Sequence, residues 1–176
     1  MKKIKLSIKD IALTAVFTAL LAALSQVAFP LPFGVSLTLQ TFAAALCGYC
    51  LSGFLGVISV LVYIALGAVG VPVFSSFRSG VGVLAGPSGG FIFGFILLAL
   101  LCGIAVKKSR PIAALLSVIG LILCHLFGVV QFSLVTHTPL VSSFLSISLP
   151  FLLKDAVSVF LAYLIALKLR KIIIKK

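Results

Sequence analysis

Apolar residues run through most of this chain in long segments, which are separated by short stretches of proline, glycine or basic residues. A membrane-spanning helix needs about 20 mainly apolar residues. Six segments approach or reach that length, and the second and third are short enough that we expect tilt or local thinning of the bilayer. The predicted helices cover residues 11–29, 37–51, 55–68, 91–106, 112–132 and 149–169. A connection rich in serine and threonine, residues 133–148, precedes the last helix.

The stretches between the segments predict how the helices are joined. Pro30 and Pro32 end the first helix, and the paired glycines Gly53 and Gly56 favour a tight reversal between the second and third. Residues 69–90 are rich in glycine, contain two prolines and are otherwise mostly apolar. Because such a stretch is too irregular for a helix and too apolar for a solvated linker, we expect a re-entrant-type loop between helices three and four.

The composition indicates the same class of protein. Hydrophobic residues make up 62% of the 176 residues and charged residues 9%, whereas in a soluble domain about a quarter of the residues are charged. We therefore predict an all-α integral membrane protein in which residues 1–176 form a single transmembrane domain within the lipid bilayer. The four cysteines all lie in apolar segments, so we expect them to be packing residues rather than disulfide partners.

Basic residues are confined almost entirely to three clusters, although the formal net charge is +12. Basic clusters at the ends of apolar segments mark the cytoplasmic side of a membrane protein, so the pattern agrees with six helices whose N- and C-termini are both cytoplasmic. A nucleic-acid-binding surface would instead interleave aromatic, polar and basic residues along one face, and we expect no nucleic-acid partner. The clusters comprise Lys2, Lys3, Lys5 and Lys9, then Lys107, Lys108 and Arg110, then Lys168, Arg170, Lys171, Lys175 and Lys176.

Lys154 and Asp155 are adjacent charges inside the sixth apolar segment. A charge at the centre of a membrane helix costs about 2.5 to 3.5 kcal/mol on insertion scales, and such residues usually face a cavity or a partner. Neighbouring residues on a helix diverge by about 100°, so these two are poorly placed to satisfy each other fully. The predicted topology puts both of them, with Arg78, in the outer half of the protein, where an anionic ligand would balance two cations and one anion. The alternative is a purely structural charge network.

Other chemistries are poorly supported by the residues present. His125 and His137 lie far apart in the sequence without nearby carboxylates, so we predict no metal site. The glycine-rich stretch that ends at Gly90 lacks the Gly-Lys-[Ser/Thr] of a phosphate-binding loop, so any transport must draw its energy from elsewhere. With two acidic residues in the chain, acid and base groups are too scarce for an enzyme, and we expect neither catalytic residues nor a cofactor.

Small residues recur on the first predicted helix. Ala15, Ala19 and Ala23 are spaced four residues apart. Small residues at this spacing allow another helix to pack closely. The spacing fits internal packing and a partner interface equally well.

Four stretches have distinctive sequences and lie in order along nearly the whole chain. They are Leu37–Phe42 (LTLQTF), Ala65–Phe74 (ALGAVGVPVF), Gly80–Phe91 (GVGVLAGPSGGF) and Pro150–Asp155 (PFLLKD). Together they resemble the BioY family, the biotin-specific S components of energy-coupling-factor (ECF) vitamin transporters. The most specific parts of the resemblance are the Gly-Pro-Ser-Gly-Gly element and the Gly-x-Pro-Val-Phe turn.

The resemblance implies a six-helix subunit in the plasma membrane of a prokaryote, which captures biotin from outside and reorients in the membrane to release it inward. It also implies a complex with a transmembrane coupling subunit and two cytoplasmic ATPases. The repeat Ala15, Ala19 and Ala23 is similar to the docking motif in the first helix of the family. Many relatives have Pro-Gly-Asp followed by a later lysine in the last helix, whereas here Lys154 directly precedes Asp155, so the separate roles of the two charges stay open.

We hypothesise that Asp155 accepts hydrogen bonds from the ureido N–H groups of biotin, and that Lys154 or Arg78 meets its carboxylate or its ureido oxygen. Two phenylalanines are expected to contact the thiophane ring and the alkyl chain. The alternatives are an S component for another small anionic vitamin, a solitary secondary transporter driven by an ion gradient, and a structural subunit without a ligand. The expected ligand contacts are Lys154, Asp155, Arg78, Gln40, Ser79, Gly82, Phe74 and Phe77.

Overall fold

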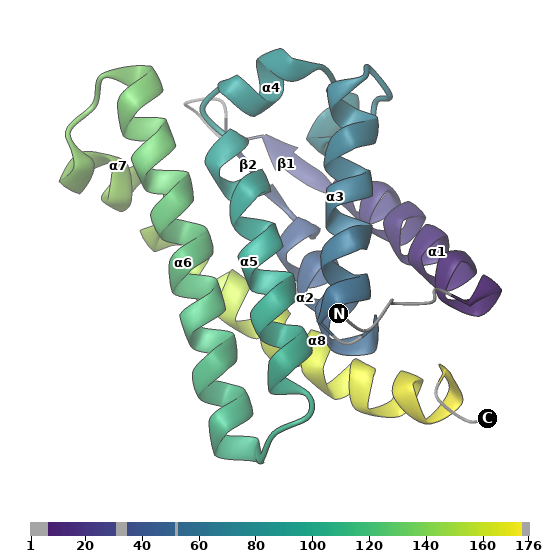
Figure 1. The fold of residues 1–176 in the computed structure, drawn as a ribbon. Helices are drawn as coiled ribbons and strands as arrows, with labels where there is room; N and C mark the ends of the chain where they lie inside the picture. Colours follow the sequence, from purple (N-terminus) through teal and green to yellow (C-terminus); the bar gives the residue numbers. More distant parts are fainter. Residues whose placement is uncertain (1–6, 31–34, 52, 174–176) are drawn as a thin grey trace, which may run out of the picture.

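A computed structural model describes residues 7–30, 35–51 and 53–173 of the chain. Pro32 and the basic residues Lys2, Lys3, Lys5, Lys175 and Lys176, on which sequence predictions drew, lie outside the described residues. Within them the elements are α1 (Ile8–Ser25), β1 (Ala28–Pro30), β2 (Ser36–Thr38), α2 (Gln40–Leu51), α3 (Phe54–Ala68), the 3-10 helix η2 (Ser75–Phe77), α4 (Val81–Ala85), α5 (Gly89–Ala105), α6 (Arg110–Thr136), α7 (Leu140–Ile147) and α8 (Leu149–Ile173) (Figure 1).

Each of the six predicted apolar segments contains one helix, so the predominantly helical fold is confirmed. Three of these helices, α1, α6 and α8, are long and apolar enough to cross a membrane. The other three, α2, α3 and α5, are also apolar but have 12, 15 and 17 residues. The number of spans, the side on which the termini lie and the re-entrant character of residues 69–90 stay predictions.

The first connection differs from the prediction. α1 ends at Ser25, before the predicted end at residue 29, because the chain turns into the short strand β1. This strand pairs antiparallel with β2, with Ala28 opposite Thr38 and Pro30 opposite Ser36. The hairpin therefore delivers residues 35–38 to the start of α2, beside the second turn of α8, where Lys154 reaches the carbonyl of Thr38.

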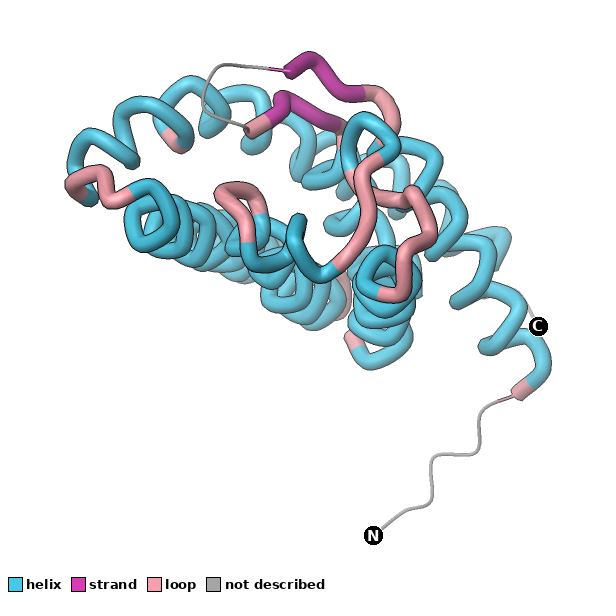
Figure 2. Tube along the Cα trace, turned by 90° about the horizontal axis from the view of Figure 1, so that it is seen from above, coloured by secondary structure: helices cyan, strands magenta, loops and turns pink. Residues whose placement is uncertain are grey.

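Two connections contain helices that the sequence did not predict. Residues 69–90, expected to be too irregular for a helix, form η2 and the short helix α4. The polar connection 133–148 contains α7. In Figure 1, α4 and α7 lie at the end of the molecule opposite to the turn between α5 and α6. Seen from the α4 end (Figure 2), the strands lie along one side of the helices.

The helix α2 lies inside the bundle, and the long helices α1 and α8 lie on its outside. Almost every residue of α2 is buried, whereas the long helices α1 and α8 bury only part of their surface. α2 contacts α1, α3, α5 and α8. Its approach to α5 requires Gly48, because a Cβ at this position would collide with the backbone of Ala99. α2 is thus the central helix, and it carries its first turn to the cavity described below.

The first and last described helices meet at one end of the molecule. The Nζ of Lys9 in α1 donates to the carbonyl of Ile173 in the last turn of α8, at 2.6 Å. Arg170 in α8 donates to the carbonyl of Tyr49 in α2 at 2.8 Å. Figure 1 shows the turn between α5 and α6 at this same end. The described members of all three basic clusters therefore gather at one end of the molecule.

Candidate ligand-binding site

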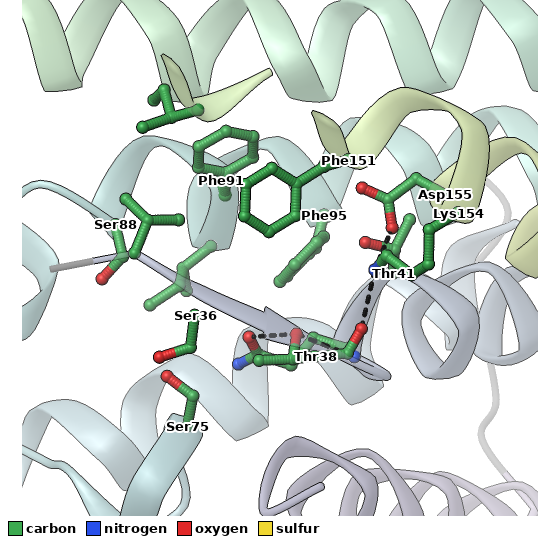
Figure 3. Close-up of a pocket in the computed structure, with 14 residues that line it drawn as sticks. Ser36, Thr38, Thr41, Ser75, Ser88, Phe91, Phe95, Phe151, Lys154 and Asp155 are labelled. Carbon is green, nitrogen blue, oxygen red and sulfur yellow. Dashed lines mark hydrogen bonds and ion pairs between the residues drawn. The ribbon is translucent and has the colours of Figure 1, made fainter. Parts of the chain in front are cut away.

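A narrow cavity lies toward the opposite end, between the hairpin, α2, α5, α7 and α8. It is lined by charged, hydroxyl and aromatic side chains that come from segments far apart in the sequence. Figure 3 shows these residues as sticks. They are Val35, Ser36, Thr38, Gln40, Thr41, Ser75, Ser88, Phe91, Ile92, Phe95, Ile147, Phe151, Lys154 and Asp155.

The charged end of the cavity is made by Lys154 and Asp155 in the second turn of α8. The ammonium of Lys154 pairs with Oδ1 of Asp155 and also donates to the backbone carbonyl of Thr38 at 2.7 Å. Lys154 thus bends back to meet its neighbour, in contrast to the expected divergence. Asp155 is only 4% exposed. Its Oδ1 pairs with the Lys154 ammonium, and a carboxylate oxygen with one such partner can still accept a further hydrogen bond beside the cavity.

His125 of α6 contacts the other oxygen of this carboxylate, and no motif in the sequence indicated this contact. Its Nε2 lies 3.3 Å from Oδ2 of Asp155, and its Nδ1 lies 2.8 Å from the hydroxyl of Ser148. Its ring meets that of Phe91 edge to face at 5.5 Å between centroids. His125 thus connects α5, α6 and α8 behind the cavity. Among the described residues, no group of three or more His, Cys, Asp or Glu side chains lies close enough to hold a metal ion.

An aromatic wall and a group of hydroxyls complete the cavity. Phe91 and Phe95 come from one face of α5, and Phe151 from the first turn of α8. Figure 3 places these rings between Lys154 and Asp155 on one side and three serines on the other. The serines, which we call the hydroxyl end, are Ser36 of β2, Ser75 of η2 and Ser88 before α5. The cavity therefore presents two polar ends separated by an apolar middle.

Of the other predicted contacts, Gln40 lines the cavity. Arg78 does not line it but contacts Ser75, which does. The Gln40 amide donates to the hydroxyl of Tyr63 at 2.6 Å and accepts from Thr38 at 3.0 Å, so it is held in place by buried partners. The Arg78 guanidinium donates to the hydroxyl and carbonyl oxygens of Ser75 at 2.9 and 3.2 Å. Through Ser75, this cation stands next to the hydroxyl end of the cavity.

The remaining four predicted contacts do not line the cavity. Phe74 is fully buried and packs against the ring of Tyr63 and the backbone of Gly67. Phe77 is 70% exposed, and its backbone N–H donates to Gln26. Ser79 is half-buried and Gly82 is exposed. The aromatic wall is thus supplied by other phenylalanines, and a ligand-binding role of these four residues stays a prediction.

The alanine repeat lies on a different surface. Ala15, Ala19 and Ala23 are exposed on α1, while Phe17 and Leu21 of the same helix are buried. Within the described residues, the repeat is therefore on the outer face of α1 rather than in the internal packing. That placement favours the partner-interface interpretation over the internal one.

Comparisons with known proteins agree with this arrangement. The profile of the BioY family matches residues 1–175. "Biotin transporter BioY" of Thermotoga maritima is 36% identical over 92% of this chain and 95% of its own length. "Biotin transporter BioY" of Rhodobacter capsulatus is 34% identical, over 90% and 91%.

A solved structure is also similar. A crystal structure described as the S-component for biotin from an ECF-type ABC transporter superposes with a TM-score of 0.84 at 26% identity. The match covers 93% of this chain and 92% of that one. The family consists of membrane transporters rather than enzymes, and the chain has the apolar helices of a multi-pass membrane protein. The chain belongs to the BioY family.

Proposed function

We propose that this chain is the substrate-binding subunit of an ECF-type transporter, which captures biotin from outside and delivers it inward while partner subunits hydrolyse ATP. Family membership and the named relatives support this function. The single observation that carries it is the cavity, in which the Lys154–Asp155 ion pair and a group of hydroxyls stand at opposite ends of an aromatic wall. Biotin has the same order of groups: a polar ureido ring, an apolar middle and a carboxylate.

The charged end suits the ureido ring. A ureido group offers two N–H donors and one carbonyl acceptor. Oδ1 of Asp155 is a buried carboxylate oxygen that pairs with the Lys154 ammonium. Because a carboxylate oxygen can accept more than one hydrogen bond, it can also accept from an N–H group, and the Lys154 ammonium can donate to the carbonyl. His125 keeps Oδ2 occupied and thereby leaves Oδ1 as the oxygen that faces the ligand.

The hydroxyl end suits the carboxylate. Ser36, Ser75 and Ser88 can each donate an O–H to a carboxylate oxygen, and Arg78 supplies a positive charge behind Ser75. Phe91, Phe95 and Phe151 would cover the thiophane ring and the alkyl chain between the two ends. In this orientation, Lys154 recognises the ureido oxygen and Arg78 contributes to the carboxylate site.

The topology and partners belong to the same proposal. Residues 1–176 would form one substrate-binding domain of six spans, with both termini in the cytoplasm of a prokaryotic cell and the cavity toward the outside. The contact between Lys9 and Ile173, and the basic clusters at that end, support this orientation. The exposed alanines of α1 would dock a transmembrane coupling subunit, which connects the chain to two ATPases.

Thermal unfolding of the purified chain with biotin, lipoate, thiamine or riboflavin tests the function. Because a ligand that binds only the folded state raises the unfolding temperature, biotin alone should raise it. A rise with another vitamin instead would assign a different substrate. No rise with any of the four would favour a structural subunit. Uptake in cells that persists without the ATPases and collapses with an ionophore would favour a solitary secondary transporter.

A further inference from the structure

An apolar groove lies between α6 and α8, at the basic end of the molecule and away from the biotin cavity. Its volume is about 510 Å³, within the range of about 300 to 1,000 Å³ that is typical of small-molecule sites. Each of the two helices contributes one face, on which small or apolar residues recur at helical spacing. The main lining residues are Ala114, Val118 and Leu121 of α6 and Val159, Phe160 and Leu164 of α8.

The groove is open to the side and has no free polar group on its floor. Val118 is 53% exposed and Phe160 is 60% exposed, so a large apolar surface is open to the lipid acyl chains of the membrane. The hydroxyl of Tyr49 on the floor is bonded to that of Ser117 at 2.6 Å, and the Ser117 hydroxyl also donates to a backbone carbonyl of α6. The floor therefore suits a hydrocarbon chain rather than a polar ligand.

The mouth of the groove is strongly basic. Arg110 at the start of α6 lines the groove, and Lys107 and Lys108 lie in the preceding turn, all three exposed. The whole chain has two acidic residues, and both are engaged elsewhere. Asp10 accepts hydrogen bonds from Ser7 at the start of α1, and Asp155 is buried beside the biotin cavity. No carboxylate of the described residues is thus placed to neutralise the mouth.

We propose that the groove binds an anionic phospholipid of the cytoplasmic leaflet, with an acyl chain between α6 and α8 and the phosphate on the guanidinium of Arg110. Arginine matches phosphate with two parallel hydrogen bonds, and basic pockets between membrane helices on the cytoplasmic side bind anionic headgroups. The proposal rests on the proposed orientation, in which the basic end of the molecule faces the cytoplasm. It does not depend on the biotin cavity, which contains Lys154 and Asp155 of α8. It adds a lipid site to the transporter subunit.

Native mass spectrometry of the full-length purified chain tests this site, with phosphatidylglycerol and phosphatidylcholine as the probes. We expect the parent chain to retain phosphatidylglycerol preferentially. Arg110→Gln should lower that retention about fivefold, which is the factor that one basic residue contributes near anionic lipid. Lys171→Gln removes one exposed charge at the same end but outside the groove, and should change retention little. Ala114→Trp should fill the groove and lower retention of either lipid.

Biotin binding serves as the folding control, because neither Arg110 nor Ala114 lines the biotin cavity. The proposal would be overturned if the parent chain retained the two lipids equally. It would also be overturned if the Arg110→Gln chain folded and bound biotin but kept the parent's preference for phosphatidylglycerol. An Ala114→Trp chain that retains both lipids but no longer assembles with its coupling subunit would overturn it as well, since the groove would then be a protein interface.

Discussion

The two polar ends of the cavity are built differently. The charged end is formed by helices: Asp155 is buried and fixed by Lys154 beside it and by His125 of α6. The hydroxyl end is formed by a strand, a 3-10 turn and the residue before α5, so its three serines come from connections. Because helices packed in a core hold side chains more rigidly than connections do, we infer that the charged end determines which ligand is recognised. The hydroxyl end then contributes a weaker, adaptable contact.

The largest expected effect is at Asp155. Asp155→Asn removes the charge that accepts the ureido N–H groups, so biotin affinity should fall about 100-fold, the upper part of the range for a hydrogen bond to a charged group. Titration calorimetry of the purified variant measures this. Asp10→Asn is the matched control, because it makes the same chemical change at the start of α1, outside the cavity. Equal affinity of Asp155→Asn and the parent would remove Asp155 from the site.

A smaller loss is expected at Lys154, and it distinguishes the two ends. Lys154→Gln should weaken biotin about 20-fold, since a charged hydrogen bond to the ureido oxygen is lost. Because the lysine is assigned to the ureido ring, the amide of biotin, which lacks the carboxylate charge, should be weakened by the same factor. A loss confined to biotin itself would instead place the carboxylate at the charged end and reverse the proposed orientation.

His125 should act by holding Asp155. Its Nε2 contacts Asp155 and its Nδ1 contacts Ser148, and two substitutions distinguish these contacts. Gln can keep a donor near the position of Nε2, whereas Asn can keep one near the position of Nδ1. We expect His125→Asn to lose about tenfold in biotin affinity and His125→Gln to recover most of it, because one hydrogen bond to a charged group is at stake. Equal losses in both variants, or additivity of His125→Asn with Asp155→Asn, would contradict this positioning role.

The smallest effect is expected at the hydroxyl end. Arg78→Gln leaves Ser75 in place and removes only the positive charge behind it, so biotin should be weakened about threefold and the amide of biotin not at all, because a partly exposed charge is screened by solvent. Competition binding with both ligands checks this. A loss at Arg78 larger than that at Lys154 would overturn the ranking of the two ends.

The sequence predicted α1, α2, α3, α5, α6 and α8 well, because each of them corresponds to a continuous apolar segment. It also identified Lys154 and Asp155, because charges in an apolar segment are exceptional. The β1–β2 hairpin could not be predicted, since each strand has three residues and shows no alternating pattern. The helix α7 was missed because its serines and the preceding proline are typical of a connection.

The rest of the site depends on contacts between distant segments. His125 meets Asp155 only when α6 packs beside α8, and no spacing in the sequence signals that contact. The chain contains 15 phenylalanines, most of them in apolar segments, so the sequence could not single out Phe91, Phe95 and Phe151. The ring of Phe74, which the sequence motif suggested as a ligand contact, lies on Gly67 in the structure.

An experimental structure of the chain with bound biotin tests the central claim most directly. The account predicts a ureido nitrogen within hydrogen-bond distance of Oδ1 of Asp155, the ureido oxygen at Nζ of Lys154, and the carboxylate among Ser36, Ser75 and Ser88. Biotin bound in the opposite direction, with its carboxylate on Lys154, or bound outside this cavity, would contradict it.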